Sequence, residues 1–107
     1  MKINNQLEIL EQLERFKGWV RPKKLTISKE RLMIDYLINR GWDEKRARSE
    51  ANRVYNRDKT GTLWYLIKYK RVERFRRREV ERGYEYKITA EGREYLKRNT
   101  PLIDVIE

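Results

Sequence analysis

The sequence predicts one α+β domain that is mainly helical and carries a small β-hairpin. Apolar residues recur at helical spacing over most of the chain, whereas a short stretch near its C-terminal end alternates apolar and polar residues, as strands do. With 107 residues and no cysteine, the chain can bury one modest core without disulfides. We therefore expect a single domain with an N-terminal helix and connector (1–27), a core region (28–98) and an apolar tail (99–107).

The first expected helix covers residues 4–17. Ile9, Leu13 and Phe16 lie at i, i+4 and i+7, which places them on one apolar stripe. Gly18 is expected to end this helix. The stretch "WVRPKKLTIS" that follows contains a proline and predicts a connector with room for one helical turn.

A second helix is expected over residues 29–40, with Ser28 as its N-cap. Its apolar residues cover most of the helix circumference, so we expect it to be the central and most buried helix. Gly41 is a typical C-cap, and Trp42 can close over that end as the hydrophobic contact of the cap.

A third helix is expected from Glu44 to about Asn56, capped by Asp43. Small alanines on one side predict close packing against a neighbour. The opposite side carries a stripe of arginines, which is either solvated or faces phosphates: Arg46, Arg53 and Arg57.

The segment "NRDKTGT" has the composition of a turn, and Thr62 can cap a short fourth helix. Leu63, Leu66 and Ile67 would face inward at i, i+3 and i+4. Trp64, Tyr65 and Lys68 would then face outward, although an indole is more often found in a core or a subunit contact than against a base.

A β-hairpin is expected from residues 72–78 and 84–89, joined by a turn that contains Gly83. Tyr84, Tyr86 and Ile88 alternate with polar residues and are expected to face the core. Thr89 is a good cap for a final helix, residues 90–98, which would bury Tyr95 and Leu96.

The composition favours a polyanionic partner. The chain has 27 Lys and Arg, 17 Asp and Glu and a net charge of +10, and such an excess attracts nucleic acid before specific contacts form. Without histidine or cysteine, the usual general bases, nucleophiles and zinc ligands are missing, so we expect no enzyme activity, no metal and no cofactor. The charged share of 41% is typical of thermophile proteins and also of basic nucleic-acid binders.

The sequence also predicts a soluble protein. No apolar run approaches the ~20 residues of a membrane span, and the N-terminal residues do not resemble a signal peptide. We expect no membrane association and a cytoplasmic, nucleoid-associated location. No cavity or sensor residue is evident, so a small-molecule effector is not expected.

The stretch from Thr60 to Leu96 resembles the winged helix-turn-helix regulators, in particular the PadR-like and MarR-like groups. The matching positions are a capped helix with spaced leucines, a Val-Glu-Arg strand and a Tyr-x-x-Thr-x-x-Gly-Arg start of the next helix. In this sequence they are Thr62, Leu63, Leu66, Val72, Glu73, Arg74, Tyr86, Thr89, Gly92 and Arg93. One departure is that the family has a further Leu and a Gly before the first wing strand, where this chain has only "KYKR".

The resemblance implies a winged helix-turn-helix with an extra N-terminal helix, in which a short helix reads the major groove and the wing holds phosphates. Residues 60–69 are the favoured recognition helix, and residues 28–38 are the alternative, disfavoured because their apolar coverage suggests burial. The expected DNA contacts come from this helix, the wing and the arginine stripe: Thr60, Thr62, Tyr65, Lys68, Arg74, Arg76, Arg77, Arg78, Arg82, Arg46, Arg53 and Arg57.

The function expected from these residues is that of a sequence-preferring double-stranded DNA-binding regulator, a repressor that acts by occlusion. A homodimer is expected because one short helix reads few bases, with the first helix and the apolar tail as its interface. Two alternatives stay open: a non-specific chromatin or ribosomal protein, and a basic adaptor or inhibitor of an acidic host protein.

Overall fold

The computed structural model describes residues 5–76 and 83–99, with the side chain of Arg76 left out. Within these residues the chain is mainly helical with one two-stranded antiparallel sheet, which confirms the predicted α+β class. The apolar tail lies outside the described residues. The elements are α1 (Asn5–Phe16), η1 (Pro22–Lys24), α2 (Ser28–Asn39), α3 (Glu44–Lys68), β1 (Val72–Arg76), β2 (Tyr84–Ile88) and α4 (Ala90–Asn99).

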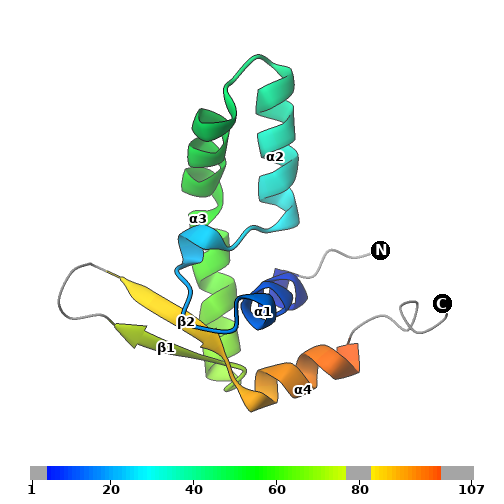
Figure 1. The fold of residues 1–107 in the computed structure, drawn as a ribbon, viewed down its shortest axis with the longest axis vertical. Coiled ribbons are helices and arrows are strands. Elements are labelled where there is room, and N and C mark those ends of the chain that lie inside the picture. The colour runs from blue at the N-terminus through cyan, green and yellow to red at the C-terminus, as the bar shows by residue number, and fades with distance from the viewer. Residues whose placement is uncertain (1–4, 77–82, 100–107) are drawn as a thin grey trace.

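The elements form two parts, which we call the arm and the body (Figure 1). The arm is α2 and the first half of α3, which run antiparallel, side by side, and project from the rest of the molecule. The body consists of α1, the hairpin and α4 gathered around the second half of α3. A single helix, α3, therefore runs through both parts.

The body holds the main hydrophobic core. Val20 in the connector forms an isolated β-bridge with Tyr86 of β2, so the connector is tied to the sheet. Leu63 and Leu66 face this core, as the sequence predicts, and Ile67 packs at its edge. Tyr95 and Leu96 were predicted to be buried, but they are only partly buried against the core. The buried residues are Ile9, Leu10, Leu13, Val20, Leu25, Ile27, Leu63, Leu66, Val72, Tyr86 and Ile88.

The prediction that the second helix is the most buried one is wrong. Of the apolar residues of α2, only Ile34 and Leu37 are buried, whereas Leu32 and Tyr36 are 64% and 55% exposed. The arm has its own small cluster, in which these two residues meet Ala47 and the neighbouring alanine of α3. Because α2 packs chiefly against one helix, only one side of it can be covered, however many apolar residues it carries.

The ends of the arm helices follow the sequence in part. Asp43 caps α3 by accepting a hydrogen bond from Arg46 N at 2.9 Å, as predicted. At the end of α2, Gly41 has a φ of 98°, and the amides of Gly41 and Trp42 donate to Ile38 O and Leu37 O at 2.9 and 3.0 Å. This is the glycine-dependent C-cap that the sequence predicts.

Ser28 is not the N-cap of α2. Ile27 holds that position, and Ser28 is the first helical residue. The amide and the hydroxyl of Ser28 both donate to the carboxylate of Glu8 in α1. The serine therefore joins two helices instead of capping its own.

The predicted turn at "NRDKTGT" is wrong, because α3 is one helix of 25 residues that runs straight through it. The Thr60 hydroxyl donates to the carbonyls of Asn56 and Arg57, and the Thr62 hydroxyl donates to Asp58 O at 2.9 Å. Both hydroxyls thus donate to backbone carbonyls of the preceding turn of the same helix, and neither residue caps a helix.

Lys59 lies at the centre of the same segment and is completely buried. Its ammonium group donates to Leu25 O at 2.9 Å, to Glu30 Oε2 at 3.1 Å and to Asn52 Oδ1 at 2.6 Å. These partners come from the connector, α2 and α3. We infer that this node holds the segment helical against its local preference for a turn.

Replacement of Gly61 by alanine tests the continuity of α3. A Cβ at this position would meet nothing within 4 Å, and the residue is exposed within the helix. Gly61→Ala is therefore expected to stabilise the protein by ~0.5–1 kcal/mol, because alanine has the higher helix propensity. Urea denaturation followed by circular dichroism measures this. A loss of stability would contradict a helix at this position.

The α3 helix ends without glycine. Lys70 takes the left-handed position with a φ of 60°, and the amides of Lys70 and Arg71 donate to Ile67 O and Leu66 O at 2.9 and 2.8 Å. At the end of α1, Lys17 (φ 54°) has the positive φ that the sequence would assign to Gly18. The "KYKR" segment is thus long enough for a complete C-cap that leads directly into β1.

The hairpin and the last helix match their predictions closely. Val72 pairs with Ile88 and Arg74 with Tyr86 across the antiparallel sheet. Thr89 Oγ1 accepts from Gly92 N at 3.0 Å and donates to Lys70 O at 2.7 Å, so it caps α4 and fixes it to the turn after α3. Tyr84 is the exception: it was expected to face the core but is exposed, because the end of the hairpin extends beyond the body.

Candidate nucleic-acid interface

The continuity of α3 changes the candidate interface. At the usual helical repeat, the three predicted arginines fall within about 60° of the exposed Trp64 and Lys68, on one side of the helix. Had the chain turned at residues 56–62, these groups would have belonged to two separately oriented helices. We call this side the α3 stripe: Arg46, Arg53, Arg57, Trp64 and Lys68.

The α3 stripe is long and straight. Its first and last members are separated by ~33 Å at the normal helical rise. This length is close to the ~34–36 Å of one turn of B-form DNA. The stripe therefore spreads its cations over a length comparable to one turn of a duplex.

The arginines of the stripe have local partners. Arg46 lies with its guanidinium carbon 4.7 Å from the centre of the Trp42 ring. Arg53 is hydrogen-bonded to the carboxylate of Glu50, which lowers the pKa of Glu50 and raises that of Arg53. Both side chains of the Glu50–Arg53 pair are on the surface, where such pairs contribute little and are screened by salt. Arg53 can therefore exchange Glu50 for a phosphate.

The predicted groove-reading residues separate into two kinds. The hydroxyls of Thr60 and Thr62 are used inside α3, so they are poor candidates for base contacts. Tyr65 and Lys68 are exposed, as the sequence predicts. Trp64 is 56% exposed and is not part of the core, so it faces outward as the helical spacing predicts, and a subunit contact at this residue stays a prediction.

The wing arginines are only partly described. In the register of the hairpin, Arg74 lies opposite Tyr86 and Arg76 opposite Tyr84, and Arg74 shares a face with the buried Val72. The Arg74 guanidinium carbon lies 4.5 Å from the centre of the Tyr84 ring. Arg77, Arg78 and Arg82 lie outside the described residues, so their predicted role stays a prediction.

The side of the hairpin that faces away from the core carries a pair of aromatic residues that the sequence reasoning missed. The rings of Trp19 and Phe75 are 5.7 Å apart, and Lys87 Nζ lies 5.9 Å from the centre of the Trp19 ring. The alternation in β1 could have indicated Phe75, since it is out of phase with Val72. Nothing in the sequence indicates Trp19, because its position depends on the bridge between Val20 and Tyr86.

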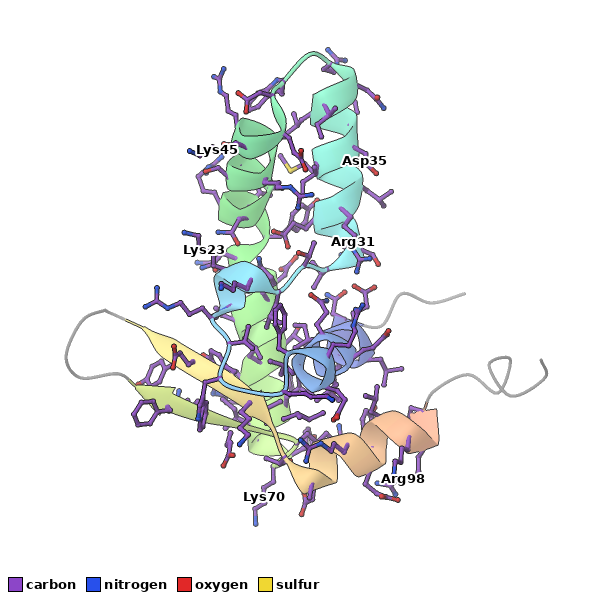
Figure 2. The ribbon with its side chains drawn as sticks, in the orientation of Figure 1. Lys23, Arg31, Asp35, Lys45, Lys70 and Arg98 are labelled. Atoms are coloured by element: carbon purple, nitrogen blue, oxygen red, sulfur yellow. The ribbon has the colours of Figure 1, made fainter. Side chains whose placement is uncertain are left out.

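The charged groups of the arm point to both flanks (Figure 2). Lys45 lies on the outer side of α3 and Asp35 on the outer side of α2, while Lys70 points away from the body at the end of α3. Within residues 5–76 and 83–99, no three acidic residues gather as a possible metal site. In that same part of the chain, no helix is long and apolar enough to cross a membrane.

Comparisons with known proteins identify no relative: no family model, no curated protein and no solved structure matches this chain.

Proposed function

We propose that this protein binds double-stranded DNA through the α3 stripe and acts as a transcriptional regulator that excludes other proteins from its site. The observation that carries the proposal is the alignment of three arginines and a lysine along one straight helix face, in a chain of net charge +10. Such a row neutralises phosphates and fixes the position of a protein on a duplex. Tyr65 and Lys68, at the end of the stripe, are the residues proposed to meet base edges.

The winged-helix relationship is part of this proposal for the body. In favour of it are the order of helices before the hairpin, and the bridge from the connector to β2. One feature differs from a helix-turn-helix, in which the two helices cross at ~90–120°: here α2 and α3 run antiparallel as an arm. Residues 28–38 were disfavoured as the reading helix because burial was expected, but α2 is largely exposed, so that argument no longer applies. We favour α3 because it carries the α3 stripe.

A homodimer remains part of the proposal. The apolar tail lies outside the described residues, so its predicted share of the interface stays a prediction. Ile9, Leu10 and Leu13 of α1 are buried in the core of the body, so α1 has less apolar surface to offer than the sequence suggests. Leu32 and Tyr36 lie one turn apart on the exposed side of α2 and are the better candidates. A second copy packed on this side would bring a second α3 stripe into the complex, as recognition of a two-fold site requires.

The salt dependence of binding tests the α3 stripe. Arg53→Ala/Arg57→Ala is expected to weaken binding to every duplex and to flatten the slope of log K against log salt by ~0.9 for each phosphate that is no longer neutralised. The matched control is Lys45→Ala/Arg48→Ala, which removes the same charge from other sides of α3 and should change the slope far less. Glu50→Gln should strengthen binding, because it leaves Arg53 without its carboxylate partner. Equal slopes for the two double variants would remove the stripe from the interface.

Selection from a random duplex library at two salt concentrations tests the regulatory function. An enriched two-fold motif is expected, and its half-site spacing would measure the dimer. Strong, salt-sensitive binding without an enriched motif would show a chromatin-like protein instead. Absence of binding at ~150 mM salt would refute the proposal in favour of an acidic protein partner.

A further inference from the structure

Trp64 is exposed at a position that neither the core nor the proposed phosphate contacts explain. It belongs to the α3 stripe, two turns after Arg57 and one turn before Lys68, whose Nζ lies 5.5 Å from the centre of its ring. The Tyr65 ring meets it edge-on at 5.4 Å between centres, with 83° between the two planes. The buried side of the same turns is supplied by Leu63 and Leu66. The indole therefore presents its surface to solvent beside a row of cations.

The charge around Trp64 indicates the kind of partner. Residues 59–72 contain no Asp or Glu, although 17 acidic residues are distributed over the rest of the chain. Two exposed aromatic residues of this segment have a cation against the ring: Lys68 lies beside Trp64, and the Arg71 guanidinium carbon lies 5.1 Å from the centre of the Tyr69 ring. Flat rings among cations complement a nucleobase next to its phosphate, because bases stack on aromatic side chains and phosphates pair with the cations.

A continuous duplex does not offer a base to such a ring, since the two faces of each base are covered by its neighbours. An aromatic or apolar side chain reaches a base face only where a step is unstacked, kinked, gapped or single-stranded. We propose that Trp64 stacks on an unstacked nucleobase, so that the α3 stripe favours nucleic acid with a gap or bulge over a continuous duplex. This inference rests on the proposed function and adds a structural preference to it.

Binding to paired substrates tests the inference. The affinity for a ~20-base-pair DNA duplex is compared with that for the same duplex carrying a one-nucleotide gap, by fluorescence anisotropy. The intact protein is expected to prefer the gapped duplex by about 5- to 150-fold, the ratio that one stacked base is worth. Trp64→Ala should bring the ratio of the affinities for the gapped and the continuous duplex close to one, and Trp64→Phe should keep part of the preference. The same comparison with a continuous and a gapped RNA duplex shows whether the unstacked base that is preferred belongs to DNA or to RNA.

Two controls separate the roles of the residues. Trp19→Ala removes another exposed tryptophan, which lies in the connector beside the hairpin and is 43% exposed, and should leave the preference unchanged. Arg53→Ala/Arg57→Ala should weaken both duplexes equally, so that their ratio is retained. In the variant Trp19→Phe/Trp42→Phe, the emission of Trp64 should be quenched by the gapped duplex more than by the continuous one.

Equal affinities for gapped and continuous substrates, or a preference that survives Trp64→Ala, would overturn the inference and leave the proposed function intact. Absence of binding to either substrate would refute both the inference and the proposed function.

Discussion

Replacement of Lys59 by methionine is expected to cost a large part of the stability of the protein. The change leaves Glu30, which is 4% exposed, buried without its cation, and removes the donor to Leu25 O and Asn52 Oδ1. Breaking a buried ion pair by removing one partner costs ~3–5 kcal/mol, against a total of ~5–15 kcal/mol for a typical domain. The free energy of unfolding is measured by urea denaturation.

The double variant Lys59→Met/Glu30→Leu shows whether the loss comes from the uncompensated carboxylate. It should recover a large part of the stability, since an apolar pair of similar volume replaces a buried ion pair at little cost. Lys68→Met is the matched control, because Lys68 is an exposed lysine of the same helix, and it should change the stability by less than ~0.5 kcal/mol. A loss below ~1 kcal/mol in Lys59→Met would mean that the node does not join the arm to the body.

Replacement of Gly92 by alanine is the second large expected effect. A Cβ at this position would lie 2.1 Å from Arg71 O and 2.8 Å from Ile88 Cγ1, so backbone would have to move. The expected loss is ~1–3 kcal/mol, although alanine is the better helix former. The same substitution is thus expected to change the free energy of unfolding in opposite directions at two helical positions: Gly61→Ala should raise it and Gly92→Ala should lower it.

The decisive result is whether each substitution raises or lowers the free energy of unfolding, which urea denaturation of both variants measures. If Gly92→Ala were stabilising, α4 would not lie against the turn that joins α3 to β1. A destabilised protein that keeps its circular dichroism spectrum would agree with the close approach of Gly92 to Arg71 O, since Thr89 still fixes the start of α4 through Lys70 O.

Much of the secondary structure was predictable because its signals are local. The apolar stripe of α1, the Asp43 and Thr89 caps, the glycine at the end of α2 and the alternation in β2 each depend on a few neighbouring residues. The excess of lysine and arginine was enough to indicate a polyanionic partner. The candidate arginines on the first half of α3 lie where the sequence placed them, on an exposed face.

The errors arose where a distant contact overrides a local preference. Thr60, Gly61 and Thr62 favour a turn, but the buried contacts of Lys59 with the connector and α2 hold the segment in a helix. The apolar residues of α2 suggested burial, but the arm supplies only one neighbouring helix. The spacing of apolar residues along the sequence shows neither the partners of Lys59 nor how many elements pack against α2.

The sequence by itself determined the α+β class, most helix ends, the hairpin and the basic character of the surface, because propensity, capping and charge act over a few residues. Only the tertiary structure decided that α3 is continuous, because its middle is secured by groups ~29–34 residues away along the chain. That continuity places Arg46, Arg53, Arg57, Trp64 and Lys68 on one straight face. The candidate interface is therefore a consequence of packing, although each of its residues is visible in the sequence.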